Sequence, residues 1–326
     1  MNIMPRTIDE QLTKHLTDVH SIEEQALQQL RTAPKIAGDE ELGRVFREHL
    51  AETEDQERRV REHLIARGAD ASRMKDLVAR AGGVGMVLFA RSQPDTPGKL
   101  VAHAYSYEHM EMAAYDLLAI AADCAGDQET VDLARSIREQ ENAMATRLAE
   151  RFDLAVDASL RRVDDEGPGE HLTDYLADAH AIEQQAMRLL EKGRGIAGQS
   201  DLARVFSDHL AETRGHQSVV RARLEARGSD PSRLKDAAMR VGAFNLTAFF
   251  SAQPDTPAKL AGFAFAFEHL EIGGYEQLGR VAARAGDQET ARVAERIIAD
   301  ERTAAAAIHR QFRAAMEASL KAQTVA

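Results

Sequence analysis

The chain has 326 residues, enough for two domains of average size. Hydrophobic residues make up 44% of it, yet only 5% are aromatic and tryptophan is absent, which favours long helices over β-sheets. The net charge of −12 excludes a broad basic surface for nucleic acid, and the single cysteine, Cys124, excludes a disulfide framework and a CxxC metal site.

The sequence also lacks the features of membrane and exported proteins. It has no run of about 18 consecutive apolar residues, and its N-terminus lacks the basic head and apolar core of a secretory signal. We therefore expect a soluble, cytoplasmic protein with neither a membrane nor nucleic acid as a partner.

Two amphipathic helices are predicted at the start of the chain. Apolar residues recur every three or four positions over 8–30, before a break at Pro34 and Gly38. A second run with the same spacing covers 42–64 and ends at Gly68. These helices are expected to form a hairpin.

A crossover and a second hairpin follow. The crossover over 72–90 is apolar and predicts a short helix. Thr96 and Pro97 are typical of a helix start, so a third helix is expected from there to about Ala125. The fourth helix carries one apolar stripe over 131–152. Two hairpins joined by a long connection predict a four-helix bundle with one crossover.

Nearly every landmark recurs about 160 positions later in the chain. FREHLAET at 46–53 becomes FSDHLAET at 206–213. QPDTP at 93–97 returns unchanged at 253–257, and AGDQET at 125–130 returns unchanged at 285–290. A tandem duplication explains this pattern better than chance.

The duplication predicts two bundles in one chain. The first covers 1–160, a linker containing Gly-Pro-Gly covers 161–169, and the second bundle covers 170–326. Such a chain would internalise an interface that single-copy relatives form between subunits. We therefore expect an intramolecular pseudo-dimer that is monomeric or a weak homodimer.

Histidines and glutamates interrupt the apolar stripes of all four helices. On the first helix, His20 and Glu23 lie between Leu16 and Leu27, so they face the interior of the bundle. The full set is His20, Glu23, His49, Glu52, Glu108, Glu111 and Glu141, repeated as His180, Glu183, His209, Glu212, Glu268, Glu271 and Glu301.

Several of these side chains are expected at the same level of the bundle. Antiparallel helices rise about 1.5 Å per residue away from the turn that joins them. Counting from the first turn places Glu23 level with His49, and counting from the second places Glu111 level with Glu141. Each hairpin therefore brings its polar residues together.

Buried carboxylates need a neutralising partner, because an isolated buried charge costs many kcal/mol. Four carboxylates and two imidazoles between four helices are the ligand set for a pair of metal ions. Iron is the expected ion, with manganese and zinc as alternatives. Such a pair binds oxygen or peroxide and cycles by two electrons.

Three segments carry a resemblance to a known family. IExQA at 22–26, HxxET at 49–53 and EHxE at 108–111 recur in the second copy, and they resemble the YciF-like branch of the ferritin-like superfamily. The resemblance implies an all-α fold of two tandem ferritin-like four-helix bundles, similar to rubrerythrin-type bundles, and a stress-associated role. It also implies a dinuclear metal site in each bundle.

The resemblance implies a ligand set in each copy, transferred position by position. In the first copy the implied ligands are Glu23, His49, Glu52, Glu108, Glu111 and Glu141; in the second they are Glu183, His209, Glu212, Glu268, Glu271 and Glu301. No residue is assigned a catalytic role beyond metal binding.

Two departures from the superfamily pattern put part of this set in doubt. Ferritin-like di-iron sites usually carry ExxH on the second and fourth helices, but the second helix here reads HxxE and the fourth has Met144 or Ala304 where an imidazole is expected. The second copy also gains His216 where the first has Gln56, so its site is expected to differ in affinity or metal.

Several residues are candidates either for binding metal or for hydrogen-bonding its ligands: His20, His109, Tyr115, His180, His216, His269 and Tyr275. A purely structural histidine is the favoured interpretation of His109, and a plain boundary tyrosine that of Tyr115. The glutamates have an alternative as well, because they would also suit core ion pairs with arginines or a solvated seam.

Two functional hypotheses follow. The first is a metal-dependent oxidoreductase that acts on O₂, peroxide or Fe(II), with two metal ions per bundle. It would need an external reductase, because the chain has no four-cysteine iron site. The alternative is a non-enzymatic stress or scaffold protein whose metal sites are structural or vestigial.

Overall fold

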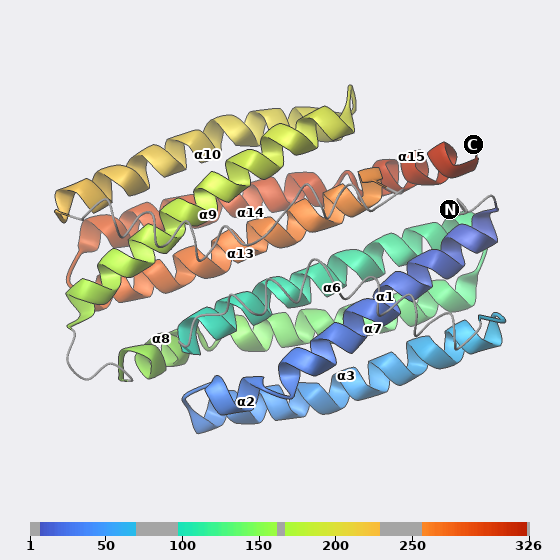
Figure 1. Ribbon diagram of the computed structural model, residues 1–326, viewed down its shortest axis with the longest axis horizontal. Helices are drawn as coiled ribbons and strands as arrows, with labels where there is room; N and C mark the ends of the chain where they lie inside the picture. The colour runs from blue at the N-terminus through green and yellow to red at the C-terminus, as the bar shows by residue number, and fades with distance from the viewer. Residues whose placement is uncertain (1–6, 70–96, 162–166, 229–255, 325–326) are drawn as a thin grey trace.

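In the computed structural model, residues 7–69, 97–161, 167–228 and 256–324 are described, and every regular element in these ranges is an α-helix. The helices fall into two halves that follow each other along the chain (Figure 1). The predicted all-α fold of two tandem helical bundles is confirmed. The predicted crossover helices lie outside the described residues.

The first half is built on four long helices. α1 (Ile8–Leu30) packs against α3 (Glu40–Ala66) and α6 (Pro97–Ala125), while α7 (Gln128–Ala149) packs against α6 and α3. The short α2 (Ala33–Ile36) lies between α1 and α3, where the sequence predicted only a break. Because each helix touches two neighbours, the polar residues of their apolar stripes meet inside the bundle.

The second half repeats this arrangement. α9 (Pro168–Ala197) packs against α10 (Asp201–Ala226) and α13 (Thr256–Arg284), and α14 (Gln288–His309) packs against α13 and α10. Short helices follow both bundles, α8 (Phe152–Arg161) after α7 and α15 (Phe312–Thr324) after α14. Among the described residues, no helix combines the length and apolar character needed to cross a membrane.

Polar caps and glycines set where the helices begin and end. Thr7 and Glu10 form a capping box at the start of α1, and the side chain of Asp127 caps α7. Gly68 and Gly126 adopt φ angles of 80° and 74° just beyond α3 and α6. This left-handed conformation favours glycine, so both helices stop there.

The fourth helix of each bundle is broken, although its apolar stripe predicted one continuous helix through Phe152. α7 ends at Ala149, where the Arg151 amide bonds to the carbonyl of Leu148 and the Arg151 guanidinium donates to the carbonyl of Arg147. The side chain thus takes the acceptor that a continuous helix would have used. The break lets α8 turn and pack against both α6 and α13.

The two bundles meet through α6 and α13, which lie side by side in Figure 1. A Cβ on Gly273 would lie 3.2 Å from Cβ of Ala102, and one on Gly262 would lie 3.7 Å from Cβ of Ala113. Glycines therefore let these helices approach closely. Gly262 and Gly273 are the second-copy equivalents of Ala102 and Ala113, so each alanine contacts the equivalent of the other. The interface therefore has approximate twofold symmetry, like that of a homodimer.

Candidate metal centres

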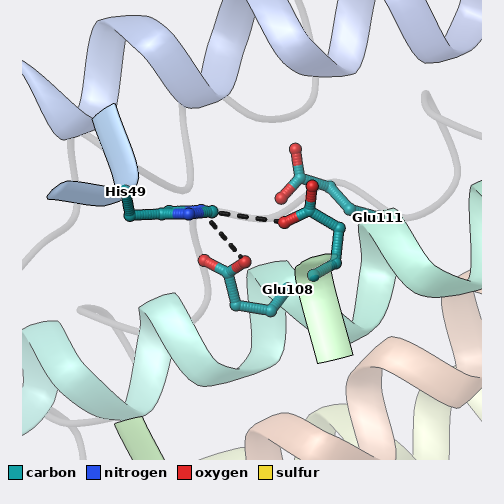
Figure 2. Close-up of side chains that lie close together, drawn as sticks. His49, Glu108 and Glu111 are labelled. Carbon is teal, nitrogen blue, oxygen red and sulfur yellow. Dashed lines mark ion pairs between the residues drawn. The ribbon is translucent and has the colours of Figure 1, made fainter. Parts of the chain in front are cut away.

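Four side chains from three helices converge inside the first bundle. His49 of α3, Glu108 and Glu111 of α6, and Glu141 of α7 are buried, and one donor atom of each lies within 4.8 Å of the others. Nε2 of His49 lies 3.2 Å from Oε2 of Glu108 and 3.7 Å from Oε2 of Glu141. Figure 2 shows the His49 imidazole and the Glu108 and Glu111 carboxylates pointing toward one another.

The equivalent residues form the same cluster in the second bundle. His209, Glu268, Glu271 and Glu301 are buried with donor atoms within 4.8 Å of one another. Nε2 of His209 lies 2.8 Å from Oε2 of Glu268 and 3.0 Å from Oε2 of Glu301. One imidazole and three carboxylates therefore meet in each bundle.

Glu52 and Glu212 lie on the opposite side of the imidazoles from the clusters. Nδ1 of His49 is 3.1 Å from Oε2 of Glu52, and Nδ1 of His209 is 3.1 Å from Oε2 of Glu212. Glu52 also pairs with Arg147, and its side chain is 36% exposed. These two glutamates, which the sequence predicted as metal ligands, therefore contact the imidazoles from outside the two clusters.

Glu23 and Glu183 are fully buried and bound to tyrosines. The hydroxyl of Tyr115 donates to Oε1 of Glu23, and that of Tyr275 donates to Oε1 of Glu183. In the second bundle, Glu183 also forms a donor group with His216 and Glu301. The tyrosines therefore hydrogen-bond carboxylates that the sequence predicted as ligands.

His20 and His180 lie outside the clusters. Nε2 of His20 is 2.9 Å from Oε1 of Glu57, and these two residues form a separate group with Glu24. Glutamines stand at the equivalent positions of the second copy, 184 and 217, so His180 lacks this group. Sequence reasoning missed Glu24 and Glu57, although their joint change to glutamine between the copies was a signal.

His109 and His269 stack on each other between the bundles, with ring centroids 3.6 Å apart. Nδ1 of each donates to a backbone carbonyl four residues earlier, that of Tyr105 or Phe265, at 2.8 Å. These two histidines therefore contact each other across the interface and take no part in the clusters.

Burial and mutual repulsion shape the protonation of the clusters. Burial, with the charges of Glu141 and Glu23, raises the pKa of Glu111 well above its usual value. Burial lowers the pKa of His49, but the charge of Glu108 and hydrogen bonds to Glu108 and Glu52 outweigh it and raise that pKa to about 10. Without a metal ion, Glu111 is therefore protonated near neutral pH, and His49 carries a positive charge.

The donor set fits a divalent metal ion. Oε1 of Glu111 and both carboxylate oxygens of Glu271 are buried without a hydrogen-bond partner, although buried polar atoms are normally paired. One imidazole nitrogen and several carboxylate oxygens suit iron, manganese or zinc. The fold and these residues define a class of protein: two linked helical bundles, each with a buried cluster that could hold metal.

Comparison with known proteins identifies the family. The chain belongs to the family described as "Domain of unknown function (DUF892)", which matches residues 7–160 and again 168–321. It is similar to Protein YciF of Escherichia coli (strain K12), with 27% identity over 157 residues that cover 46% of this chain and 92% of YciF. No solved structure matches the chain. The predicted YciF-like family and its tandem duplication are confirmed.

Proposed function

We propose that this protein binds metal ions in both bundles and acts as an oxidoreductase on O₂, peroxide or Fe(II). One observation carries the proposal: each bundle buries one imidazole and three carboxylates with donor atoms within 4.8 Å of one another. Buried carboxylates at this density need a counter-charge, and a redox metal would supply it. The stress-associated role and the cytoplasmic setting expected from the sequence belong to the same proposal.

Each residue of the first centre has a role in this proposal. His49, Glu108, Glu111 and Glu141 hold the metal, and Glu52 accepts a hydrogen bond from Nδ1 of His49, which keeps Nε2 directed at the cluster. When bound, iron or manganese supplies two-electron redox chemistry that side chains alone lack. An external reductant would complete each cycle.

The test compares a double variant, Glu111→Gln and Glu271→Gln, with the unchanged protein. Glutamine preserves the shape of each side chain but removes a charged ligand. We expect loss of bound iron and of peroxide consumption with helical content retained, measured by elemental analysis, peroxide assay with a chemical reductant, and circular dichroism.

A matched control is Glu57→Gln, which alters a buried glutamate outside the two clusters. It should retain both metal and activity. Unchanged iron content in the double variant would refute the ligand assignment. If the unchanged protein binds iron but turns over neither peroxide nor Fe(II), the enzymatic part alone is refuted.

A specific observation also supports the non-enzymatic alternative. With a pKa of about 10, His49 is protonated at neutral pH and pairs with Glu108 in the absence of metal. Such an ion-paired core would stabilise a scaffold protein on its own. In that case metal-free protein should unfold at nearly the same temperature as protein dialysed against Fe(II) or Zn(II), whereas ligand binding to the folded state raises that temperature.

A further inference from the structure

The two bundles differ at one position beside their clusters. α10 carries His216 where α3 carries Gln56. Nδ1 of the buried His216 lies 2.9 Å from Oε1 of Glu301 and 3.7 Å from Oε1 of Glu183. These three residues form a second donor group beside the cluster of His209.

Glu301 belongs to both donor groups of the second bundle. Its Oε2 is 3.0 Å from Nε2 of His209, while its Oε1 is 2.9 Å from Nδ1 of His216. A carboxylate whose two oxygens face separate donor groups has the arrangement of a ligand that bridges two metal ions.

A neighbouring carboxylate orients His216. Its Nε2 lies 3.2 Å from Oδ2 of Asp300, which leaves Nδ1 directed at Glu301. The first bundle has Gln140 at the position of Asp300, and Oε1 of Gln140 accepts a hydrogen bond from Arg59 instead. The imidazole and the carboxylate that orients it are therefore replaced together.

Gln56 is a poorer ligand for zinc or iron than His216. It is 0% exposed, and neither of its amide atoms has a hydrogen-bond partner. An amide oxygen is neutral and suits magnesium or calcium, whereas zinc and iron prefer imidazole. Among the described residues, the only imidazole-containing donor group at the centre of the first bundle is that of His49.

The group of His20, Glu24 and Glu57 does not replace the missing donor. Oε1 of Glu57, which lies 2.9 Å from Nε2 of His20, is also 3.5 Å from Nε of Arg61. A guanidinium stays charged at any ordinary pH and repels a cation at the same oxygen. This group is therefore an ion-pair network and supplies a control position.

Resting on the metal binding proposed above, we propose that the two bundles carry unequal metal loads. The second bundle holds a pair of ions bridged by Glu301, and the first holds one ion at His49, about three ions per chain. Both bundles were expected to hold pairs on sequence grounds. The duplication has therefore separated a dinuclear centre from a mononuclear one.

Equilibrium dialysis against buffered free Zn(II), followed by elemental analysis, tests this proposal. The unchanged chain should retain about three zinc ions. His216→Gln should lose one of them. This substitution introduces glutamine, the residue that the first bundle carries at this position. The double variant Gln56→His and Gln140→Asp should gain one, while Glu57→Gln should stay unchanged.

The outcomes separate this inference from the function on which it rests. Suppose that the unchanged chain binds zinc, but that neither His216→Gln nor the double variant Gln56→His and Gln140→Asp changes the number of zinc ions bound. The two bundles then carry equal loads, and the inference is wrong. If the unchanged chain retains no zinc, or retains as much after His49→Ala and His209→Ala, metal binding itself is refuted. Circular dichroism checks that each variant is folded, and His216→Gln decides the matter alone if the double variant does not fold.

Discussion

The imidazole of His49 is held from both sides, and its spacing from Glu52 explains how. Residues three apart lie on the same face of a helix, so Glu52 reaches Nδ1 while Nε2 faces Glu108. The hydrogen bond from His49, with the Arg147 ion pair, lowers the pKa of Glu52 to about 2, so this carboxylate is ionised. The reversed HxxE motif thus orients the imidazole.

Removing that orienting contact should weaken metal binding without removing a residue of the cluster. We expect Glu52→Ala to lower the affinity of the first centre for Zn(II) by about 10–100-fold, because the imidazole loses its fixed orientation. Competition with a chromophoric chelator measures this. Glu48→Ala, an exposed change on the same helix, is the control, and equal affinities in both variants would exclude the orienting role.

Metal binding should also depend on pH. Burial raises the pKa of Glu23 to about 8, more than a hydrogen bond from Tyr115 lowers it. A carboxyl pKa that is higher in the folded than in the unfolded protein stabilises the metal-free fold at pH values below the unfolded pKa. This contribution is lost as the pH rises through 8. The pKa of Glu111, a residue of the first cluster, is raised in the same way. A metal ion that binds there must displace its proton, so Zn(II) affinity should rise with pH.

Calorimetry in buffers with different ionisation enthalpies checks this expectation. The observed heat should change with the buffer, because protons are released when zinc binds. A heat that is the same in every buffer, together with a pH-independent affinity, would mean that the clusters are already deprotonated.

Sequence reasoning predicted which side chains face the interior but not which atoms meet. Helical spacing placed Glu23 level with His49, yet Glu23 accepts a hydrogen bond from Tyr115 of another helix. Height along a bundle follows from residue counting, whereas side-chain direction depends on how the two hairpins are rotated against each other. That rotation is set by packing between α1 and α6, which the repeat pattern does not encode.

At the scale of helices, periodicity predicted the four long helices of each half but not the break before α8. An apolar stripe continues across a turn when both sides of the turn are buried, as Leu148 and Phe152 are. At the break in the first bundle, the Arg151 side chain caps the carbonyl of Arg147. Such local competition between a side chain and the backbone leaves no periodic signal.

The short helix α8 stabilises the start of α6. Oγ of Ser159 accepts a hydrogen bond of 2.7 Å from the amide of Gly98. Ser159→Ala would leave that buried N–H unpaired, so we expect a loss of about 1–2 kcal/mol in the free energy of unfolding. Urea denaturation measures this loss. Ser136→Ala, whose hydroxyl lies at an exposed contact with Arg59, should cost less than about 0.5 kcal/mol, and equal losses would rule out the cap.

At the scale of the whole molecule, the bundles are joined by apolar packing and by reciprocal polar contacts. Lys99 pairs with Asp178 of the second half at 2.6 Å, and its equivalent Lys259 pairs with Asp18 of the first half at 2.8 Å. This ion pair occurs twice with the roles of the halves exchanged, as in an intramolecular pseudo-dimer.

The histidine stack at this interface should make stability depend on pH. Burial lowers the pKa of His109 to about 4 and that of His269 well below its usual value. Above about pH 6.5 both rings are neutral whether folded or unfolded, so they have no effect. Below that pH the unfolded chain takes up protons that the folded chain excludes, and the free energy of unfolding falls.

Replacing both rings by phenylalanine should remove this contribution. Between pH 6.5 and pH 4, the double variant His109→Phe and His269→Phe should lose less stability than the unchanged protein, by up to about 3 kcal/mol for His109 alone. Urea denaturation at both pH values gives the difference. Parallel losses in the two proteins would show that the stack remains protonated or opens without cost.

The central claim is that metal ions bind at the two buried clusters, and anomalous diffraction from crystals of Zn(II)-loaded protein tests it most directly. The account predicts anomalous peaks about 2.0–2.2 Å from His49, Glu108 or Glu141 in the first bundle and from His209, Glu268 or Glu301 in the second. A further peak is expected beside His216. Crystals that hold zinc only at surface residues, with both clusters bridged by hydrogen bonds alone, would contradict the account.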